Sequence, residues 1–422
     1  MRKKVIVVLL AGVLLAVAAF EYLIGFDLPA MNKQGEPSDK KKGEVTLHLV
    51  SWYPFSRQVL DLFHQRYPTI TVENEQIDIA YYPDLIHTQM VSKSDMDIVW
   101  LYPNMLRQYF KMGALTDWSG RPWLNRYDEA AVDAGTVFGR VLGVPYNKYA
   151  TVIFYNQDLF DRLHLSVPAN WSELMDVSAK LQTYGVAPFV LGGKDAWMLQ
   201  YLLTPRLAEI GDRYPGIYLK LQTGEKKWTD PEFHGLLDPY KDIVANHYAL
   251  AKTAALGYDQ VAAMFKEGKA AMWPMGSWAV ERFSEEFRSF RVGMFPVPIN
   301  RYGERPVVEI IANNFLTGMN WSRHPQELET FLQFLAEPEV AELYAQDTKS
   351  AVNLKGTPLI VGGSPVAMAA LDRYKPVPMR NLSKSIEKTY LPYLQQIVLG
   401  QEVSEAAFLQ ALQAAQEKDN DE

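Results

Sequence analysis

Two tryptophans flank a tight turn in the stretch FKEGKAAMWPMGSW, which covers residues 265–278. Trp273 and Trp278 enclose Pro-Met-Gly-Ser, and rings of this size either pack in a core or cover the apolar face of a flat ligand. Rings are abundant throughout the chain, with 23 Tyr, 19 Phe and 10 Trp in 422 residues. This number exceeds what packing requires, and it favours a groove in which some rings contact a ligand.

The chain offers little for covalent or metal chemistry. It has no cysteine, which excludes disulfides, thiolate zinc sites and a cysteine nucleophile. None of the seven histidines stands at a metal-binding spacing from another, and Gly192-Gly193-Lys194 lacks the spacing and the Ser or Thr of a phosphate-binding loop. A G-x-S-x-G motif is also missing. We therefore expect no catalytic residue, no metal and no cofactor.

Composition and charge describe an acidic globular protein. Hydrophobic residues make up 48% of the chain and charged residues 22%, a composition typical of folded proteins. A length of 422 residues predicts two or three domains. The formal net charge of −7 argues against nucleic acid or anionic lipid as the main partner. We expect a monomer.

The first 44 residues differ in character from the rest. Residues 1–26 carry a basic cluster followed by an apolar run, which predicts a signal peptide or an N-terminal membrane anchor. The small-residue segment Ala16–Ala18 fits a cleavage site, but the run is nearly long enough to span a bilayer, so both readings stay open. Residues 27–44 read as a polar linker. Without a cysteine, lipid anchoring is excluded, and the body is expected outside the cytoplasm.

The next segments alternate between strand and helix patterns. Residues 45–53 and 69–77 read as strands, 97–100 as a short buried strand, and helical spacing fills the segments between them. This order predicts a parallel sheet with helices on both faces, and ligands of such sheets bind beyond the carboxyl ends of the strands. Four residues lie at those ends: Trp52, Tyr53, Tyr102 and Asn104.

Further strands are expected at 151–155, 269–273, 290–298 and 306–315, separated by a long helical middle. The segments 326–346 and 383–417 read as helices.

Several motifs, taken in their order and spacing, resemble one family. They include GVPY followed by FYNQDLF and then P-x-x-W-x-E-L, and further on GKAAM followed by GSW. Together with FHQRYPTITVE, VGMFPVPI and FLQFLAEPEVAELY they extend over almost the whole chain. The chain resembles extracellular solute-binding proteins of ABC importers, family 1, in the maltose-binding-like carbohydrate group. It departs from the family's pattern at VVEIIANNF, where a Gly pair is common, and at KSAVNL.

The resemblance implies a type II periplasmic-binding-protein fold of class α/β. Two lobes, each a mostly parallel sheet flanked by helices, would enclose a ligand cleft and close on it by a hinge. The implied first lobe is 45–147 plus 299–347, and the second is 148–298 plus 348–422. The chain would cross between them near 146–152, 296–302 and 346–354.

The implied ligand is a carbohydrate, a sugar or oligosaccharide. A sugar has apolar C–H faces that aromatic rings cover, and a rim of hydroxyls that polar groups pair. From the strand ends and the matched motifs we predict these ligand-binding residues: Trp52, Tyr53, Tyr102, Asn104, Tyr146, Trp197, Trp278, Glu309 and Asn313.

Each candidate also has a structural interpretation. Trp273 is expected in a buried strand, as a packing residue, whereas Trp278 is expected in the first turn of a helix at the rim of a lobe, stacked on the ligand. Tyr146 stands at a lobe crossing, where it could contact the ligand or lock the hinge. Asn313 could pair with backbone, and Glu309 could be an exposed strand residue.

Three functions remain in view. The first is a binding protein that captures a carbohydrate and delivers it to the permease subunits of an ABC transporter, without turnover. The second is a membrane-tethered ligand-binding sensor that partners a receptor kinase. The third is a secreted glycoside-active enzyme, which would need two carboxylates about 5–10 Å apart across the cleft; the sequence gives no support for such a pair.

Overall fold

A computed structural model describes residues 43–421, apart from 54, 80, 284–288, 301–303, 305, 359–366, 369–373 and 379–381. The predicted export segment and nearly all of the predicted linker lie outside the described residues. The chain from Val45 onward forms one compact unit, and the fold below is the fold of that unit. In the described part of the chain, no helix is both long and apolar enough to cross a membrane.

The first lobe begins with the predicted β-α-β-α-β order. Strand β1 pairs in parallel with both β2 and β3, and it buries Leu47 and Leu49 completely. Ser56 caps helix α2 by accepting a hydrogen bond from the backbone N–H of Val59 (3.3 Å), and α2 buries Val59 and Phe63 against the sheet. The elements are β1 (Val45–Ser51), α2 (Arg57–Arg66), β2 (Ile70–Gln76), α3 (Tyr82–Ser92) and β3 (Ile98–Leu101).

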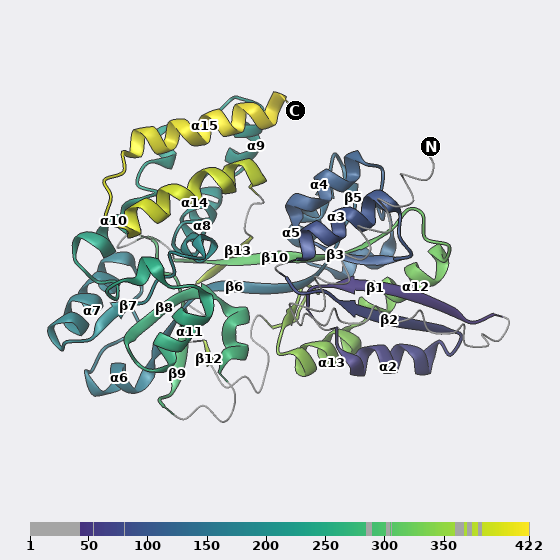
Figure 1. Cartoon of the computed structure of the whole chain (residues 1–422), viewed down its shortest axis with the longest axis horizontal. Coiled ribbons are helices and arrows are strands. Elements are labelled where there is room, and N and C mark those ends of the chain that lie inside the picture. Colours follow the sequence, from purple (N-terminus) through teal and green to yellow (C-terminus); the bar gives the residue numbers. More distant parts are fainter. Residues whose placement is uncertain are drawn as a thin grey trace, which may run out of the picture. The chain divides into compact units, whose positions relative to one another are not determined.

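Helices cover both faces of this sheet. Figure 1 shows α3 and α4 over one face and α2 and α13 over the other. The hydroxyl of Ser56 donates to Asp347 (2.7 Å), which joins the start of α2 to α13. The remaining elements of this lobe are α4 (Pro103–Lys111), η1 (Pro122–Arg126), α5 (Glu129–Ala134), β4 (Thr136–Val137), β5 (Arg140–Val141), α12 (Pro325–Leu335), α13 (Pro338–Thr348) and β11 (Ala351–Val352).

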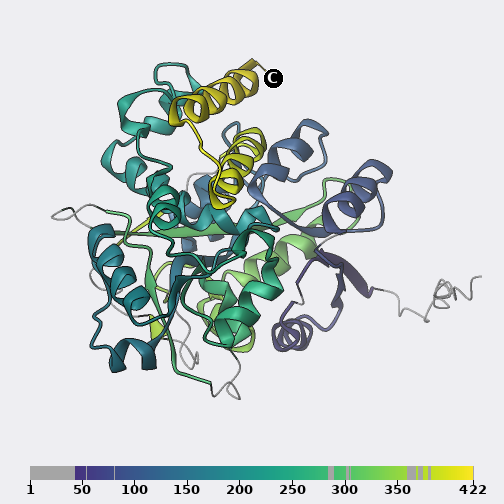
Figure 2. The same ribbon diagram turned by 60° about the vertical axis from the view of Figure 1, so that its left-hand side comes forward.

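The second lobe has its own sheet and a larger set of helices. Figure 2 shows the yellow helices α14 and α15 beside the teal helices of this lobe, and α14 packs against α10 and α15. Its strands are β7 (Ala187–Phe189), β8 (Ala270–Gly276), β9 (Val292–Pro296), β12 (Ala367–Met368) and β13 (Lys375–Pro378). Its α-helices are α6 (Gln157–Arg162), α7 (Trp171–Thr183), α8 (Thr204–Arg213), α9 (Ile217–Gln222), α10 (Asp238–Ala245), α11 (Tyr258–Lys266), α14 (Lys384–Val398) and α15 (Glu405–Asp421). Its 3₁₀ turns are η2 (Ala196–Leu202), η3 (Pro231–Phe233), η4 (Thr253–Ala255) and η5 (Ser277–Arg282).

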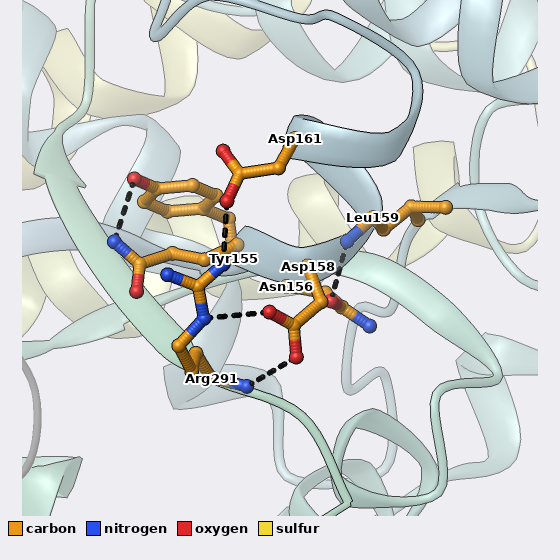
Figure 3. A network of polar contacts seen from close by, with 7 residues as sticks. Tyr155, Asn156, Asp158, Leu159, Asp161 and Arg291 are labelled. Atoms are coloured by element: carbon orange, nitrogen blue, oxygen red, sulfur yellow. Dashed lines mark hydrogen bonds and ion pairs between the residues drawn. The ribbon is translucent and has the colours of Figure 1, made fainter.

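A polar network fastens α6 to the strand beside it (Figure 3). Asn156 caps α6 by accepting a hydrogen bond from the N–H of Leu159 (2.9 Å). Arg291, just before β9, donates from its backbone N–H and its Nε to the carboxylate of Asp158 (3.0 and 2.6 Å). Its guanidinium also pairs with Asp161. These side chains are exposed, so the network lies on the surface of the lobe.

Two long strands connect the lobes. The first half of β6 (Val144–Asn156) pairs with β10 and β11, and its second half pairs with β8 and β9 of the second lobe. Strand β10 (Val307–Gly318) pairs with β13 near its start and with β3 of the first lobe near its end. Both strands therefore belong to both lobes, which is the arrangement expected of a hinge.

Packing along β10 marks where the chain changes lobe. Val308 lies in a hydrophobic cluster of the second lobe, whereas Phe315 and Leu316 lie in clusters of the first. The change falls inside β10, C-terminal to the crossing expected at 296–302. The pairing of β10 with β6 is also irregular between Ala312 and Phe315, in the segment that departs from the family's pattern. The exact lobe boundaries stay a prediction.

Candidate functional site: a cavity lined by both lobes

A cavity of about 1450 Å³ is lined by residues from both lobes and from the hinge strand β6. The first lobe contributes the segments that follow β1 and β3, together with α3 and α4. The second contributes η2, η5, the start of α11 and the start of α14. The lining is rich in aromatic residues, which are Trp52, Tyr53, Trp100, Tyr102, Tyr109, Tyr149, Trp197, Tyr201, Tyr258, Trp278, Tyr344 and Tyr390.

The first-lobe wall is a stacked pair of rings. Trp52 follows β1 and Tyr102 follows β3, and their ring centroids lie 4.3 Å apart with 21° between the planes. Parallel neighbouring strands end at the same edge of the sheet, which is why residues fifty positions apart meet here. Tyr82 packs edge-on against Trp52 (4.9 Å), and its hydroxyl donates to the carbonyl of Trp100 (2.7 Å). The contact with Tyr82 fixes the orientation of the Trp52 ring, and both Trp52 and Tyr102 line the cavity.

The second-lobe wall is a cluster of three rings. Trp197, Tyr258 and Trp278 have centroid separations of 5.5 to 6.1 Å. The guanidinium of Arg282 lies 4.5 Å from the centroid of the Tyr258 ring and pairs with Asp259 at 3.1 Å. Such a cation over a ring face restrains the ring's orientation.

Gly276 permits the placement of Trp278. A Cβ at this position would lie 2.3 Å from the indole Nε1 of Trp278, so any other residue would displace the ring. The indole N–H donates to the hydroxyl of Tyr201 at 3.4 Å. Ser277 is buried and accepts a hydrogen bond from the N–H of Ala150 on the hinge strand (3.0 Å), which fixes the turn to β6.

Polar groups of the hinge complete the lining. Asn147 donates from its amide to the hydroxyl of Tyr344 (3.2 Å), and Lys148 pairs with Asp128 (3.3 Å). Asn314 of β10 also lines the cavity, at the irregular point in the pairing of that strand. Irregular strand pairing of this kind re-aims side chains and is common beside binding sites. The cavity therefore combines aromatic walls with polar groups from the hinge strands, a combination suited to binding a solute.

The model of the family of bacterial extracellular solute-binding proteins matches residues 50–342. The chain belongs to this family. A multiple sugar-binding protein of Streptococcus mutans is 22% identical over 367 residues, which are 85% of this chain and 83% of the relative.

Solved structures share the fold. The apo form of RafE from Streptococcus pneumoniae has a TM-score of 0.69 at 20% identity, covering 90% of this chain and 99% of RafE. A chitin oligosaccharide binding protein has a TM-score of 0.70 at 22% identity, covering 86% of this chain and 94% of its own.

These findings confirm the two-lobed α/β fold and the family expected from the motifs. The family and the structural neighbours are binding proteins, so the expectation that this solute-binding protein is no enzyme is also confirmed. Family membership further implies an exported protein. Among the residues that the structure describes, no cluster of His, Asp or Glu could hold a metal ion.

Five of the nine predicted site residues of this solute-binding protein line the cavity: Trp52, Tyr53, Tyr102, Trp197 and Trp278. The structure leaves the side chains of Asn104 and Asn313 undescribed, so their predicted role stays a prediction.

Tyr146 does not line the cavity. Its ring is fully buried, lies parallel to Phe55 (6.0 Å, 16°) and meets Tyr344 edge-on (4.7 Å). Its backbone carbonyl accepts from the N–H of Asn353 (2.8 Å), and burial raises the pKa of its hydroxyl well above the ordinary value. Of the two readings, these contacts match hinge packing.

Glu309 is neither exposed nor at the cavity surface. Its carboxyl is 1% exposed and accepts hydrogen bonds from the hydroxyls of Thr151 (2.5 Å) and Thr204 (2.8 Å). The exposed-strand interpretation is therefore wrong. Burial raises the pKa of Glu309 to about 7, although the two hydroxyl hydrogen bonds oppose the shift.

Sequence reasoning missed several lining residues, above all Tyr149, Tyr201, Tyr258, Glu387 and Tyr390. Tyr149 had a detectable signal. It stands three positions from Tyr146 on one strand, and residues an odd number apart point to opposite faces. The alternation therefore places the two tyrosines on opposite faces of the strand, although it does not show which of them lines the cavity. The residues from α14 had no signal, because only the folded chain brings that helix to the site.

Proposed function

We propose that this protein captures a carbohydrate, a sugar or oligosaccharide, and delivers it to the permease of an ABC transporter. The observation that carries the proposal is the pair of aromatic walls, one on each lobe, facing one cavity. Aromatic rings cover the C–H faces of a pyranose at low entropic cost, and the polar hinge groups suit its hydroxyls. The multiple sugar-binding relative and the RafE complex with raffinose support the same ligand class.

The size of the cavity favours an oligosaccharide. Pockets for drug-sized ligands measure about 300–1,000 Å³, and this cavity has about 1450 Å³. Its lining also extends from the second-lobe helix α14 to α3 and α4 of the first lobe, a span with room for more than one ring.

Capture works through hinge closure. A ligand that contacts both walls binds the closed arrangement better than the open one, and this difference in affinity shifts the population toward closure. Strands β6 and β10 carry the motion because they are the long strands shared by both lobes. No bond of the ligand is broken in this scheme.

Three further parts of the proposal concern the context of the protein. Residues 1–26 direct export, either as a cleaved signal peptide or as a retained anchor. If the anchor is retained, the protein is membrane-associated. The exported body acts as a monomer and docks on permease subunits. Light scattering of the purified body tests the monomer, and N-terminal sequencing of the exported protein tests cleavage.

The ligand class is tested by thermal shift followed by calorimetry. The panel is a broad set of glycans that includes raffinose, maltotriose, xylotriose and chitotriose, with trigalacturonate as an anionic member. A ligand present at a hundredfold excess over its Kd adds about 2.7 kcal/mol to the free energy of unfolding, which a melt detects readily. A shift with at least one sugar, with no product on chromatography after long incubation, is expected. Absence of any shift across a broad glycan panel would overturn the proposal, and appearance of shorter products would favour the glycoside-active alternative.

A further inference from the structure

Helix α14 brings one carboxylate to the cavity, from a part of the chain remote in sequence from the aromatic walls. Glu387 lies in the first turns of α14 and its side chain is partly buried. Among the described residues, this carboxylate accepts no hydrogen bond and forms no close ion pair. Burial raises the pKa of Glu387, and the neighbouring Lys384 and Lys388 act in the opposite direction. Glu387 is therefore an acceptor with unused capacity in the wall of the site.

Glu387 lines the same cavity as Tyr102 of the first lobe and Tyr390 of the second. Burial is the main cause of the raised pKa of Tyr102, and the negative charge of Glu387 adds to it. Tyr390, one turn further along α14, has a raised pKa for the same two reasons. In Figure 1, α14 begins at the end that faces α4, the helix that starts directly after Tyr102. Glu387 thus lies in the first turn of a helix that begins beside the first lobe, and it lines the same cavity as the first-lobe wall.

Other charges at the cavity are already compensated or exposed. Lys148 pairs with Asp128 and Arg282 with Asp259. Lys384 and Lys388 are exposed and lie on the same helix as Glu387. The remaining charged lining residues, Asp78, Asp84 and Lys349, are also exposed. The two paired side chains are committed to protein partners, whereas Glu387 has its acceptor oxygens open to a ligand.

A carboxylate in this setting selects by charge and by donor pattern. It accepts two parallel hydrogen bonds from neighbouring hydroxyls of a sugar, and such charge-assisted bonds are about twice as strong as neutral ones. It repels a second carboxylate, because two anions in a partly buried site cannot both stay ionised without cost. A uronate whose carboxylate contacts Glu387 directly is therefore disfavoured, although the positive charges of Lys384 and Lys388 on the same helix offset part of this repulsion.

Building on the proposed carbohydrate function, we propose that Glu387 is a specificity-determining residue: it accepts hydrogen bonds from neighbouring hydroxyls of the bound carbohydrate and excludes ligands that are anionic at the end held by α14.

The test compares Glu387→Gln with Glu387→Ala, and uses Glu402→Gln as the matched control. Glu402 is exposed in the segment between α14 and α15 and lies outside the cavity. Calorimetry measures Kd for the panel sugar with the largest thermal shift on wild type, and for trigalacturonate. We expect Glu387→Gln to lower the affinity for the neutral sugar by about tenfold, because a hydrogen bond to a charged group becomes one to a neutral group. The affinity for the neutral sugar relative to that for trigalacturonate should fall, while the melting temperature without ligand stays unchanged.

Outcomes separate this inference from the proposed function. If wild type binds a neutral sugar and Glu387→Gln binds it as tightly as Glu402→Gln does, the inference is wrong and the proposed function stands. If Glu387→Gln loses melting temperature in proportion to its loss of affinity, its role is structural and the inference is again wrong. If no carbohydrate binds wild type, the proposed function fails and the inference fails with it.

Discussion

Trp273 and Trp278 stand five residues apart and contact the same ring, Tyr258, at centroid distances of 6.0 and 5.6 Å, but only Trp278 lines the cavity. Trp273 lies in strand β8, is 1% exposed and packs against Phe154 at a centroid distance of 5.8 Å. Trp278 follows the strand, in the 3₁₀ turn that starts at Ser277, and its ring lines the cavity. The end of β8 at Gly276 separates the two roles, because the chain leaves the sheet there and turns its next ring outward.

This relationship predicts opposite consequences for two identical substitutions. Trp273→Ala removes a large ring from a packed core and should lower the free energy of unfolding by about 3–5 kcal/mol. Trp278→Ala should lower the free energy of unfolding less than Trp273→Ala does, because its ring is only partly buried. It should weaken sugar binding by about tenfold or more, since it removes an aromatic anchor from the site. Urea denaturation and calorimetry on both variants provide the measurements. A large loss of stability in Trp278→Ala with unchanged sugar affinity would contradict the assignment.

The stacked pair of Trp52 and Tyr102 gives a second prediction. If the flat face of Tyr102 supports the sugar, Tyr102→Phe should keep the affinity within a few-fold, whereas Tyr102→Ala should reduce it by about tenfold. Tyr184→Ala is the control, because that ring is 64% exposed at the end of α7, away from the cavity. Calorimetry measures the affinity of each variant for the panel sugar that gives the largest thermal shift with wild type. Equal losses in the Phe and Ala variants would show that the hydroxyl matters and the ring face does not.

The parts of the fold and site that the sequence predicted depend on local pattern. Alternation and helical spacing predicted β1, α2, β2 and β3, and the rule for parallel strand ends predicted Trp52 and Tyr102 at one edge. Trp278 was predicted from its position in the turn after a strand and from the matched GSW motif. These signals need only neighbouring residues, which is why they survive without knowledge of the tertiary structure.

The sequence did not predict residues whose role depends on which face of a strand they occupy or on packing against distant segments. Tyr146 and Tyr149 carry the same side chain on one strand, and only the sheet's orientation decides which faces the cavity. Irregular pairing in β10 adds uncertainty of the same kind at Asn313 and Asn314. Glu387 lies more than a hundred residues from the matched GSW motif, so nothing local marks it as part of the site. Contacts made only by tertiary folding have no signature in a single sequence.

The surface network around Arg291 predicts a small effect. Asp158 has a lowered pKa mainly because it accepts the backbone N–H of Arg291, with the side-chain hydrogen bond second. Arg291→Ala keeps that backbone bond and removes only exposed ion pairs, which contribute little to stability. The melting temperature of Arg291→Ala should fall far less than that of Trp273→Ala. Because salt screens exposed charges, the difference between Arg291→Ala and wild type should be smaller still in about 0.5 M salt. Asp158→Asn is the informative companion, since it weakens the backbone interaction too. A salt-independent loss as large as that of Trp273→Ala would contradict this prediction.

The buried carboxyl of Glu309 predicts a specific dependence of stability on pH. Its pKa is raised from 4.5 to about 7 in the folded protein, chiefly by burial. Below pH 4.5 Glu309 is protonated in both the folded and unfolded states, so the folded state does not contain a buried anion and the free energy of unfolding is at its highest with respect to this group. Between pH 4.5 and 7 the folded state keeps a proton that the unfolded state releases, and the free energy of unfolding therefore falls as the pH rises. Above pH 7 the folded state carries a buried anion, at a cost on the order of 3 kcal/mol.

Substitution of Glu309 by Gln isolates this contribution. Glutamine resembles the protonated acid in shape and charge, and its carbonyl can still accept from Thr151 and Thr204, the two hydroxyl partners of Glu309. We expect the free energy of unfolding of Glu309→Gln, minus that of wild type, to rise between pH 4.5 and 7 and then level off. Urea denaturation at closely spaced pH values measures the difference, with Glu402→Gln as the exposed control. If the curves of Glu309→Gln and wild type run parallel across this range, Glu309 titrates as an ordinary carboxylate and burial does not hold its proton.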